Sequence, residues 1–147
     1  MNAAIPAAEP IPLPAPVWLM KFLGDLTLTI HFIFLYLLIG GLVLSAVWNF
    51  IGRRFGDKEA VGASGVVMSR LPIVMTYVIN FGVPPLLFVQ VLYGQVIYTA
   101  TILIGLWWMS VIFAIMGAYF AIYRCSYLAS AGRGYWGWGV LALLFIL

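Results

Sequence analysis

The chain has 147 residues, of which 65% are hydrophobic and only 7% are charged, and its mean hydropathy is +1.14. A soluble domain carries roughly a quarter of charged residues, so this composition excludes a soluble globular protein and places most of the chain in a lipid bilayer. The formal net charge of +3 does not indicate nucleic-acid binding, because the basic residues fall between apolar runs. The length accommodates four or five membrane spans of about 20 residues each.

The first sixteen residues, MNAAIPAAEPIPLPAP, contain five prolines. Proline at this density prevents a regular helix and favours an extended polyproline conformation. The segment has neither a basic start nor a long apolar stretch, so it lacks the pattern of a cleavable signal peptide. We predict that residues 1–16 form an extended arm outside the membrane, lying on its surface or on a partner protein.

Four apolar segments follow the arm and predict an all-α fold over residues 17–147, a bundle of transmembrane helices. We expect these helices at about 17–50, 71–92, 97–123 and 135–147. The last segment has 13 residues, which make about 20 Å of helix, whereas the hydrocarbon core of a bilayer is about 30 Å thick. We therefore expect this helix to be truncated and further helices to follow Leu147.

The basic residues predict the orientation in the membrane. Six of the seven lysines and arginines lie in residues 52–70 or after the third apolar segment, and only Lys21 lies on the other side. Lysine and arginine are retained on the cytoplasmic side of a membrane. We therefore expect a multi-pass protein of the cytoplasmic (inner) membrane, with residues 52–70 as an inner loop and the N-terminus outside.

His31 is the only histidine, and it lies five residues inside the apolar run that begins at Leu26, about 8 Å from the outer face. An ionisable residue at that depth indicates a functional site. Four interpretations are open: a neutral side chain bonded to a neighbouring helix, a proton relay, a ligand of a non-haem metal, or an axial ligand of haem iron.

The residues around His31 favour the haem interpretation. A relay has no acidic partner in the same helix at this depth, and a non-haem metal has no second ligand three or four residues away. Imidazole is a common axial ligand of haem iron. The flanking aromatic residues, with Gly40 and Gly41 where a macrocycle or another helix could approach the backbone, suit a flat porphyrin.

The second apolar segment carries polar residues and two adjacent prolines. Asn80 precedes the sequence FGVPPLL, in which Pro84 and Pro85 remove two backbone donors and predict a kink. Gln90 is polar in an apolar context. This indicates that its side chain bonds another helix or faces the edge of a cofactor.

The order of these features resembles the N-terminal part of subunit I of the cytochrome bd quinol oxidases. The segments LTIHF, INFGV and VQVLYGQ follow one another between Leu28 and Arg124 at a spacing similar to that family, whose first helix carries a haem-ligating histidine near the outer face. The resemblance implies that His31 ligates the iron of haem b and that Gln90 stands near the cofactor, where the family has a glutamate.

The resemblance implies a haem b-binding subunit of a respiratory electron-transfer complex, which passes electrons between quinone and a partner near the outer face. It also implies other membrane subunits as partners, and in some bd-like complexes a multihaem c-type cytochrome. Two alternatives stay open: a partial terminal oxidase subunit that reduces oxygen, and a structural subunit without cofactor in which His31 only packs. Gln90, together with Ile97 near the place of a family tryptophan, favours electron transfer over oxygen reduction.

Overall fold

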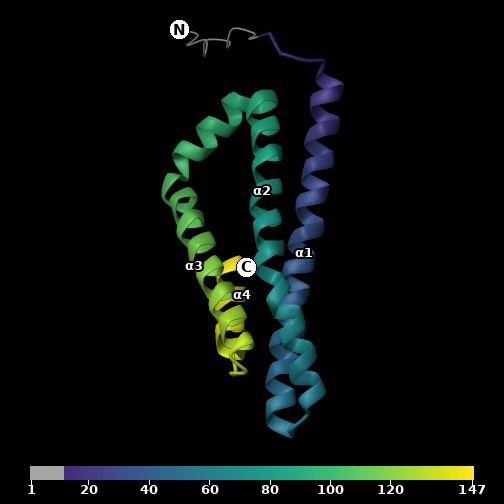
Figure 1. The fold of residues 1–147 in the computed structure, drawn as a ribbon. Coiled ribbons are helices and arrows are strands. Elements are labelled where there is room, and N and C mark those ends of the chain that lie inside the picture. Colours follow the sequence, from purple (N-terminus) through teal and green to yellow (C-terminus); the bar gives the residue numbers. More distant parts are fainter. Residues whose placement is uncertain (1–11) are drawn as a thin grey trace.

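The computed structural model describes residues 12–147, which form four helices and no strand within that range. The helices are α1 (Val17–Phe55), α2 (Lys58–Leu103), α3 (Gly105–Ser130) and α4 (Trp136–Ile146). Helices α1 and α2 run antiparallel side by side, α3 returns along α2, and α4 turns back against α3 and α1 (Figure 1). The predicted all-α helical bundle is confirmed.

Three of these helices, α1, α2 and α3, are long and apolar enough to cross a membrane, and α4 is a shorter apolar helix. The 39 residues of α1 and the 46 residues of α2 measure about 58 Å and 69 Å at the helical rise. Both lengths exceed the thickness of a hydrocarbon core, so each helix extends beyond the apolar layer that it can cross. This is the architecture of a multi-pass membrane protein.

Only the end of the proline-rich segment falls within the described residues, and residues 1–11 of the predicted arm lie outside them. Residues 12–16 are not helical, and α1 begins directly after Pro16. The carbonyl oxygen of Pro16 accepts hydrogen bonds from the backbone N–H groups of Leu19 and Met20 at 3.0 and 3.2 Å. The proline is tolerated here because the start of a helix does not need its missing N–H group.

The connection between α1 and α2 is much shorter than the loop expected over residues 52–70. Gly56 ends α1 in a left-handed conformation, with φ of 73°, which glycine adopts without steric penalty. The carboxylate of Asp57 then caps α2 by accepting from the backbone N–H groups of Glu59 and Ala60. Because adjacent residues supply a helix stop and a helix start, the rest of the expected loop is helical.

The opposite connection begins where a turn was expected, at Tyr93, but the helix is interrupted at that residue alone and resumes after it. Tyr93 has non-helical angles (φ −131°, ψ 29°), and α2 continues to Leu103 before Ile104 separates it from α3. Figure 1 shows this last part of α2 slanting from the top of the helix towards α3. Backbone angles stay helical at Pro84 and Pro85, and the non-helical break in α2 lies eight residues beyond them, at Tyr93. The kink expected at the two prolines stays a prediction.

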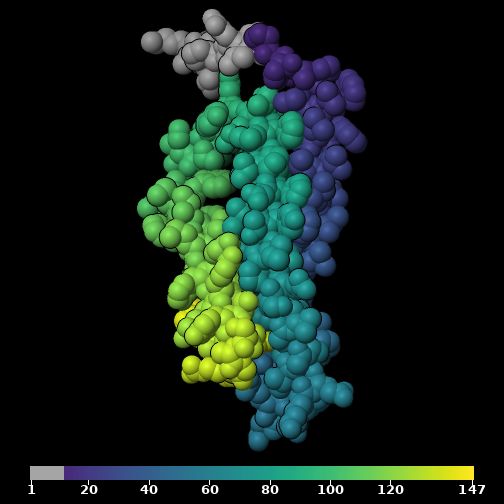
Figure 2. Space-filling view, viewed as in Figure 1, coloured from purple at the N-terminus to yellow at the C-terminus, as the bar shows by residue number. Residues whose placement is uncertain are grey.

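The buried residues gather in one half of the bundle. This half holds the α1–α2 turn and the α3–α4 connection, and we call its extremity the hairpin end. Its apolar core includes Leu38 and Leu42 of α1, Met68 of α2 and Ile122 of α3. The other half, which we call the His31 half, has few buried residues, and α3 has none before Ala118. In the space-filling view the green residues after the bend stand out to one side of α2 (Figure 2).

Candidate functional site

His31 lies on the side of α1 that packs against α2, and its ring nitrogen Nδ1 is 3.0 Å from the carbonyl oxygen of Val78. A carbonyl oxygen can only accept, so Nδ1 carries the proton and donates it. In a neutral imidazole the other nitrogen, Nε2, then keeps its lone pair. Helix packing thus selects the tautomer whose Nε2 can accept a hydrogen bond or bind a metal ion.

Gly82 provides the space in which the imidazole lies. A Cβ atom at Gly82 would be 3.1 Å from Cε1 and 3.2 Å from Nδ1 of His31, which is tighter than ordinary van der Waals contact. Val78 and Gly82 are four residues apart and therefore on the same face of α2. The imidazole of His31, the Val78 carbonyl and Gly82 together form what we call the His31 site.

The Nε2 atom of His31 is open at the surface of the chain. The ring forms one hydrogen bond, through Nδ1, and within residues 12–147 no buried side-chain nitrogen or oxygen lacks a partner. Since His31 is half-buried, the unbonded Nε2 is the accessible nitrogen. A histidine that binds a metal usually donates its other N–H to a carbonyl or carboxylate, as here. The packing and haem interpretations both explain the bond to α2, but only the haem interpretation uses Nε2.

Aromatic rings flank the His31 site on both helices. The ring of Phe34, one turn along α1, stacks on Tyr77 and Phe81 of α2 with centroid distances of 4.9 and 5.6 Å. The Phe32 ring is 5.7 Å from the imidazole and 6.1 Å from Tyr36. Phe32 and Tyr36 are exposed, so an apolar aromatic surface adjoins the site on the outside of α1.

The two glycines expected at a close approach have different surroundings. A Cβ atom at Gly41 would lie 2.6 Å from Cδ2 of Leu71, so Gly41 is a contact point between α1 and α2. Gly40 is exposed, with no atom within 4 Å of such a Cβ. Both lie about 14 Å along the helix from His31, so neither borders the His31 site.

Gln90 does not join the His31 site. It is half-buried on α2, eight residues beyond Gly82, which is about 12 Å along the helix. None of the side-chain hydrogen bonds among the described residues involves Gln90. Because every buried polar atom there is paired, the unbonded amide of Gln90 is not buried. The expectation that Gln90 faces a cofactor edge stays a prediction.

A cavity of about 280 Å³ lies between α1 and α2, next to the His31 site. Leu28 lines it, three residues from His31, and Pro85 lines it, three residues from Gly82. Lys21 and Asp25 bring one cationic and one anionic group to a wall that is otherwise mostly apolar. The cavity can therefore hold a small apolar ring and supply polar partners at one side.

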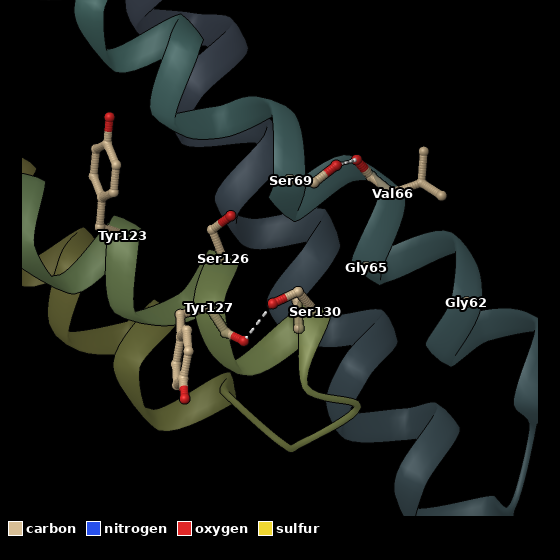
Figure 3. A pocket seen from close by; sticks show the side chains of 9 residues that line it. Gly62, Gly65, Val66, Ser69, Tyr123, Ser126, Tyr127 and Ser130 are labelled. Carbon is tan, nitrogen blue, oxygen red and sulfur yellow. Dashed lines mark hydrogen bonds between the residues drawn. The ribbon is translucent and has the colours of Figure 1, made fainter.

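A larger groove of about 540 Å³ lies at the other end of the bundle, between the start of α2 and the end of α3 (Figure 3). The hydroxyl groups of Ser69 and Ser130 on its walls donate to carbonyl groups of their own helices, each at 2.8 Å. Small residues such as Gly62 and Gly65 line the α2 side, and such residues commonly mark helix contacts in membranes. The groove brings two tyrosines, Tyr123 and Tyr127, but no carboxylate or histidine to its walls.

A buried hydrogen-bond network, which the sequence reasoning missed, joins the helices near the hairpin end. The Ser45 hydroxyl donates to the Ser64 carbonyl at 2.8 Å and accepts from the Tyr135 hydroxyl at 2.8 Å. The Asn49 amide accepts from the Tyr135 backbone N–H at 3.2 Å and donates to the Ser64 hydroxyl at 3.5 Å. The signal in the sequence is the spacing of Ser45 and Asn49, one helical turn apart in an apolar run.

No family model, curated protein or solved structure matches this chain. Within residues 12–147, no three side chains of histidine, cysteine, aspartate or glutamate gather as a metal-binding group. A haem iron takes one or two axial ligands from protein, so a single histidine can serve it. The function must therefore be argued from the geometry of the His31 site.

Proposed function

We propose that this chain is a haem b-binding membrane subunit of a respiratory electron-transfer complex, of the cytochrome bd-like type, with His31 as an axial ligand. The observation that carries the proposal is the fixed tautomer of His31, whose Nδ1 donates to the Val78 carbonyl while Nε2 is open. The haem supplies one-electron redox chemistry when it is bound. The chain's own contribution is to orient the imidazole and, in the neutral ring, to place the proton on Nδ1 so that Nε2 carries the lone pair.

The cavity beside the His31 site is the place that we propose for the quinone. It begins about one helical turn from His31, and its apolar wall suits a quinone ring. The carboxylate of Asp25 would accept a proton released from the quinol, and Lys21 would bond a ring oxygen. Electrons would then pass to a partner near the same face, one of the other membrane subunits or a multihaem c-type cytochrome.

We propose that the protein lies in the cytoplasmic membrane with its hairpin end inside. Arg53 and Lys58 flank the α1–α2 turn, and Arg133 lies in the α3–α4 connection at the same end (Figure 1). The Arg53 guanidinium joins the two connections by donating to the carbonyl of Gly132. Because basic residues are retained on the cytoplasmic side, the N-terminus and the half that holds His31 would face outward.

Cysteine labelling in intact cells tests this orientation. Cys125 is buried and is first replaced by alanine to give a background without native thiols. Ala63→Cys, on an exposed position of α2 near the hairpin end, should resist a membrane-impermeant maleimide until the cells are opened. Gln95→Cys, exposed at the other end, should label at once. The reverse pattern would overturn the orientation.

Two substitutions of His31 separate haem ligation from packing. The side-chain amide of His31→Asn can still donate to the Val78 carbonyl, because its nitrogen takes the place of Nδ1, but it has no counterpart of Nε2. If His31 ligates haem, His31→Asn should lose the haem absorbance of this subunit as fully as His31→Ala does. If His31 only packs, both variants should keep the absorbance of the parent protein while they insert into the membrane normally.

Oxygen uptake separates the electron-transfer proposal from a terminal oxidase. Gln90 cannot titrate, so it cannot deliver the protons that oxygen reduction consumes. We expect the isolated complex, freed of any separate oxidase, to show no quinol-driven oxygen uptake that depends on His31. Robust uptake that disappears in His31→Ala would contradict the proposal and support the oxidase alternative.

A further inference from the structure

The groove between the start of α2 and the end of α3 lies where charged sequence gives way to apolar sequence on both helices (Figure 3). Its walls come from residues 62–69 of α2 and 123–130 of α3, and we call it the α2–α3 groove. Helix α2 has no charged residue after Arg70, and α3 has none before Arg124. Since charged side chains are rare inside the hydrocarbon core, the α2–α3 groove lies at the depth of the lipid headgroups.

The charges around the α2–α3 groove are predominantly positive. Residues 53–70 and 124–133 include six basic and two acidic residues, a formal net charge of +4. One of the acids, Asp57, caps α2 with its carboxylate, so Glu59 is the only other carboxylate at this end of the described chain. No carboxylate lines the groove itself. The charge of the surroundings therefore complements an anionic ligand.

Arg124 contacts one wall of the α2–α3 groove. Its guanidinium carbon lies 5.4 Å from the centre of the Tyr127 ring, which is the distance of a cation–π contact, and Tyr127 lines the groove. The residue is half-buried. A guanidinium has five N–H donors in a fork that matches the oxygens of a phosphate group. Packing against Tyr127 thus holds a phosphate-binding group at the edge of the groove.

Ser126 differs from the other two serines that line the α2–α3 groove. The hydroxyls of Ser69 and Ser130 donate to backbone carbonyls of their own helices, each at 2.8 Å. None of the hydrogen bonds among the described residues involves the Ser126 hydroxyl, which is directed from α3 towards α2 across the groove (Figure 3). Ser126 therefore has a free donor for an oxygen atom bound in the groove.

An apolar surface continues from the α2–α3 groove into the hydrocarbon core. Ile73 is one turn beyond Ser69 on α2, and Phe120 is one turn beyond Tyr123 on α3. Their side chains are 54% and 64% exposed. A phospholipid has the matching order of groups, with a phosphate at headgroup depth and acyl chains directly below it.

We propose that the α2–α3 groove binds the headgroup of one anionic phospholipid. The phosphate accepts hydrogen bonds from Arg124 and Ser126, and the acyl chains lie along Ile73 and Phe120. The volume of about 540 Å³ is in the range of sites that bind small molecules, and a basic site between membrane helices is typical of anionic-lipid recognition. The inference is independent of the haem proposal and of the side of the membrane that the hairpin end faces.

Photo-crosslinking of the full chain in vesicles tests the site. The vesicles consist of phosphatidylcholine with a trace of phosphatidylglycerol that carries a photoreactive group next to its phosphate. We expect adducts on residues 62–73 and 119–130, and far fewer when the photoreactive lipid is phosphatidylcholine. Equal labelling by the two lipids would overturn recognition of the anion. Absence of adducts would overturn the lipid in favour of a protein helix, which the glycines of the α2 wall could admit.

Two arginine variants separate the groove from general attraction to the basic end of the chain. Arg124→Gln should reduce the phosphatidylglycerol adducts roughly five-fold, the usual effect of one basic residue at an anionic membrane surface. Arg54→Gln removes the same charge from the outer side of α1, about 200° around the helix from the buried Gly52, and should reduce them much less. Equal reductions would overturn a specific site.

Filling the groove tests its location without changing the charge. Ser126→Leu should lose most of the adducts, because leucine occupies the groove and removes the donor. The control is Ser110→Leu, on an exposed part of the same helix, where the hydroxyl donates to the Trp107 carbonyl and labelling should not change. Adducts that persist in Ser126→Leu would overturn the groove as the site. Displacement of the parent adducts by excess inorganic phosphate would identify free phosphate as the ligand and overturn the lipid.

Discussion

At the hairpin end, Ser45, Asn49, Ser64 and Tyr135 are at most 1% exposed, and each polar side-chain atom has a partner within the chain. In the His31 half the polar residues differ, since His31 is half-buried with an open Nε2 and Asn80 is exposed. Hydrogen-bonding capacity is thus used internally where the helices converge and is left for other molecules where they diverge. The proposed redox function is therefore expected in the His31 half.

Side-chain size explains why the two halves pack differently. At the hairpin end Gly139 of α4 meets Ala46 of α1, where an added Cβ atom would lie 3.1 Å from that of the alanine, so the backbones approach closely. The start of α3 instead carries large exposed side chains, among them Trp107 and Phe113 at 75% and 66% exposure. After the bend at Tyr93, no residue of α3 before Ala118 is buried within residues 12–147.

The largest effect is expected from Asn49→Ala, which removes two bonds of the buried network. It leaves the buried N–H of Tyr135 without an acceptor, so the free energy of unfolding should fall by about 1–3 kcal/mol. Thermal unfolding in detergent micelles measures the loss. The control is Thr29→Ala, whose hydroxyl donates only to the Asp25 carbonyl of its own helix and which should change stability by less than about 0.5 kcal/mol. Equal losses of unfolding free energy in the two variants would show that side-chain hydrogen bonds contribute equally to stability in the two halves.

A smaller loss of stability, with a specific change at the site, is expected from Gly82→Val. The added side chain overlaps the imidazole of His31 and should push it away from the Val78 carbonyl. The cost should be about 1 kcal/mol, the lower end of the range for overpacking, because the surroundings are open. If His31 ligates the proposed haem, the absorbance should shift or fall while the hairpin end stays folded. Gly62→Val is the matched control, because nothing lies within 4 Å of a Cβ there. An unchanged absorbance spectrum in Gly82→Val would show that His31 does not ligate the haem.

The sequence was sufficient for the helical fold, because that depends on local pattern, whereas the role assigned to His31 stays a prediction. Apolar runs predict where a chain crosses a membrane, but they do not mark where its helices end. Residues 58–70 are helical because Asp57 caps them, although their composition resembles a loop. The partners of His31 could not be predicted, since Val78 and Gly82 reach it only through the register of α1 against α2, which depends on contacts far apart in the sequence.

The smallest effect, and the finest test of how the His31 half is arranged, is expected from Gln90→Glu. Gln90 is about 12 Å along α2 from Gly82, so an ionised carboxylate there would interact with a charge at the His31 site by about 1.4 kcal/mol at an effective dielectric constant of about 20. That energy corresponds to about 60 mV for one electron. A negative charge stabilises an oxidised iron, so the midpoint potential of the proposed haem should fall.

The pH dependence of the midpoint potential tests the sign of this effect, and a second variant provides the control. A carboxyl group is neutral in acid and charged in alkali, so the potential of Gln90→Glu should match that of the parent protein at low pH and fall below it as the pH rises. Gln95→Glu makes the same chemical change beyond the bend at Tyr93, on an exposed position, and should shift the potential less. Equal shifts in a redox titration of the two variants would mean that the haem is not held near the Gly82 turn, and the proposed site would have to move.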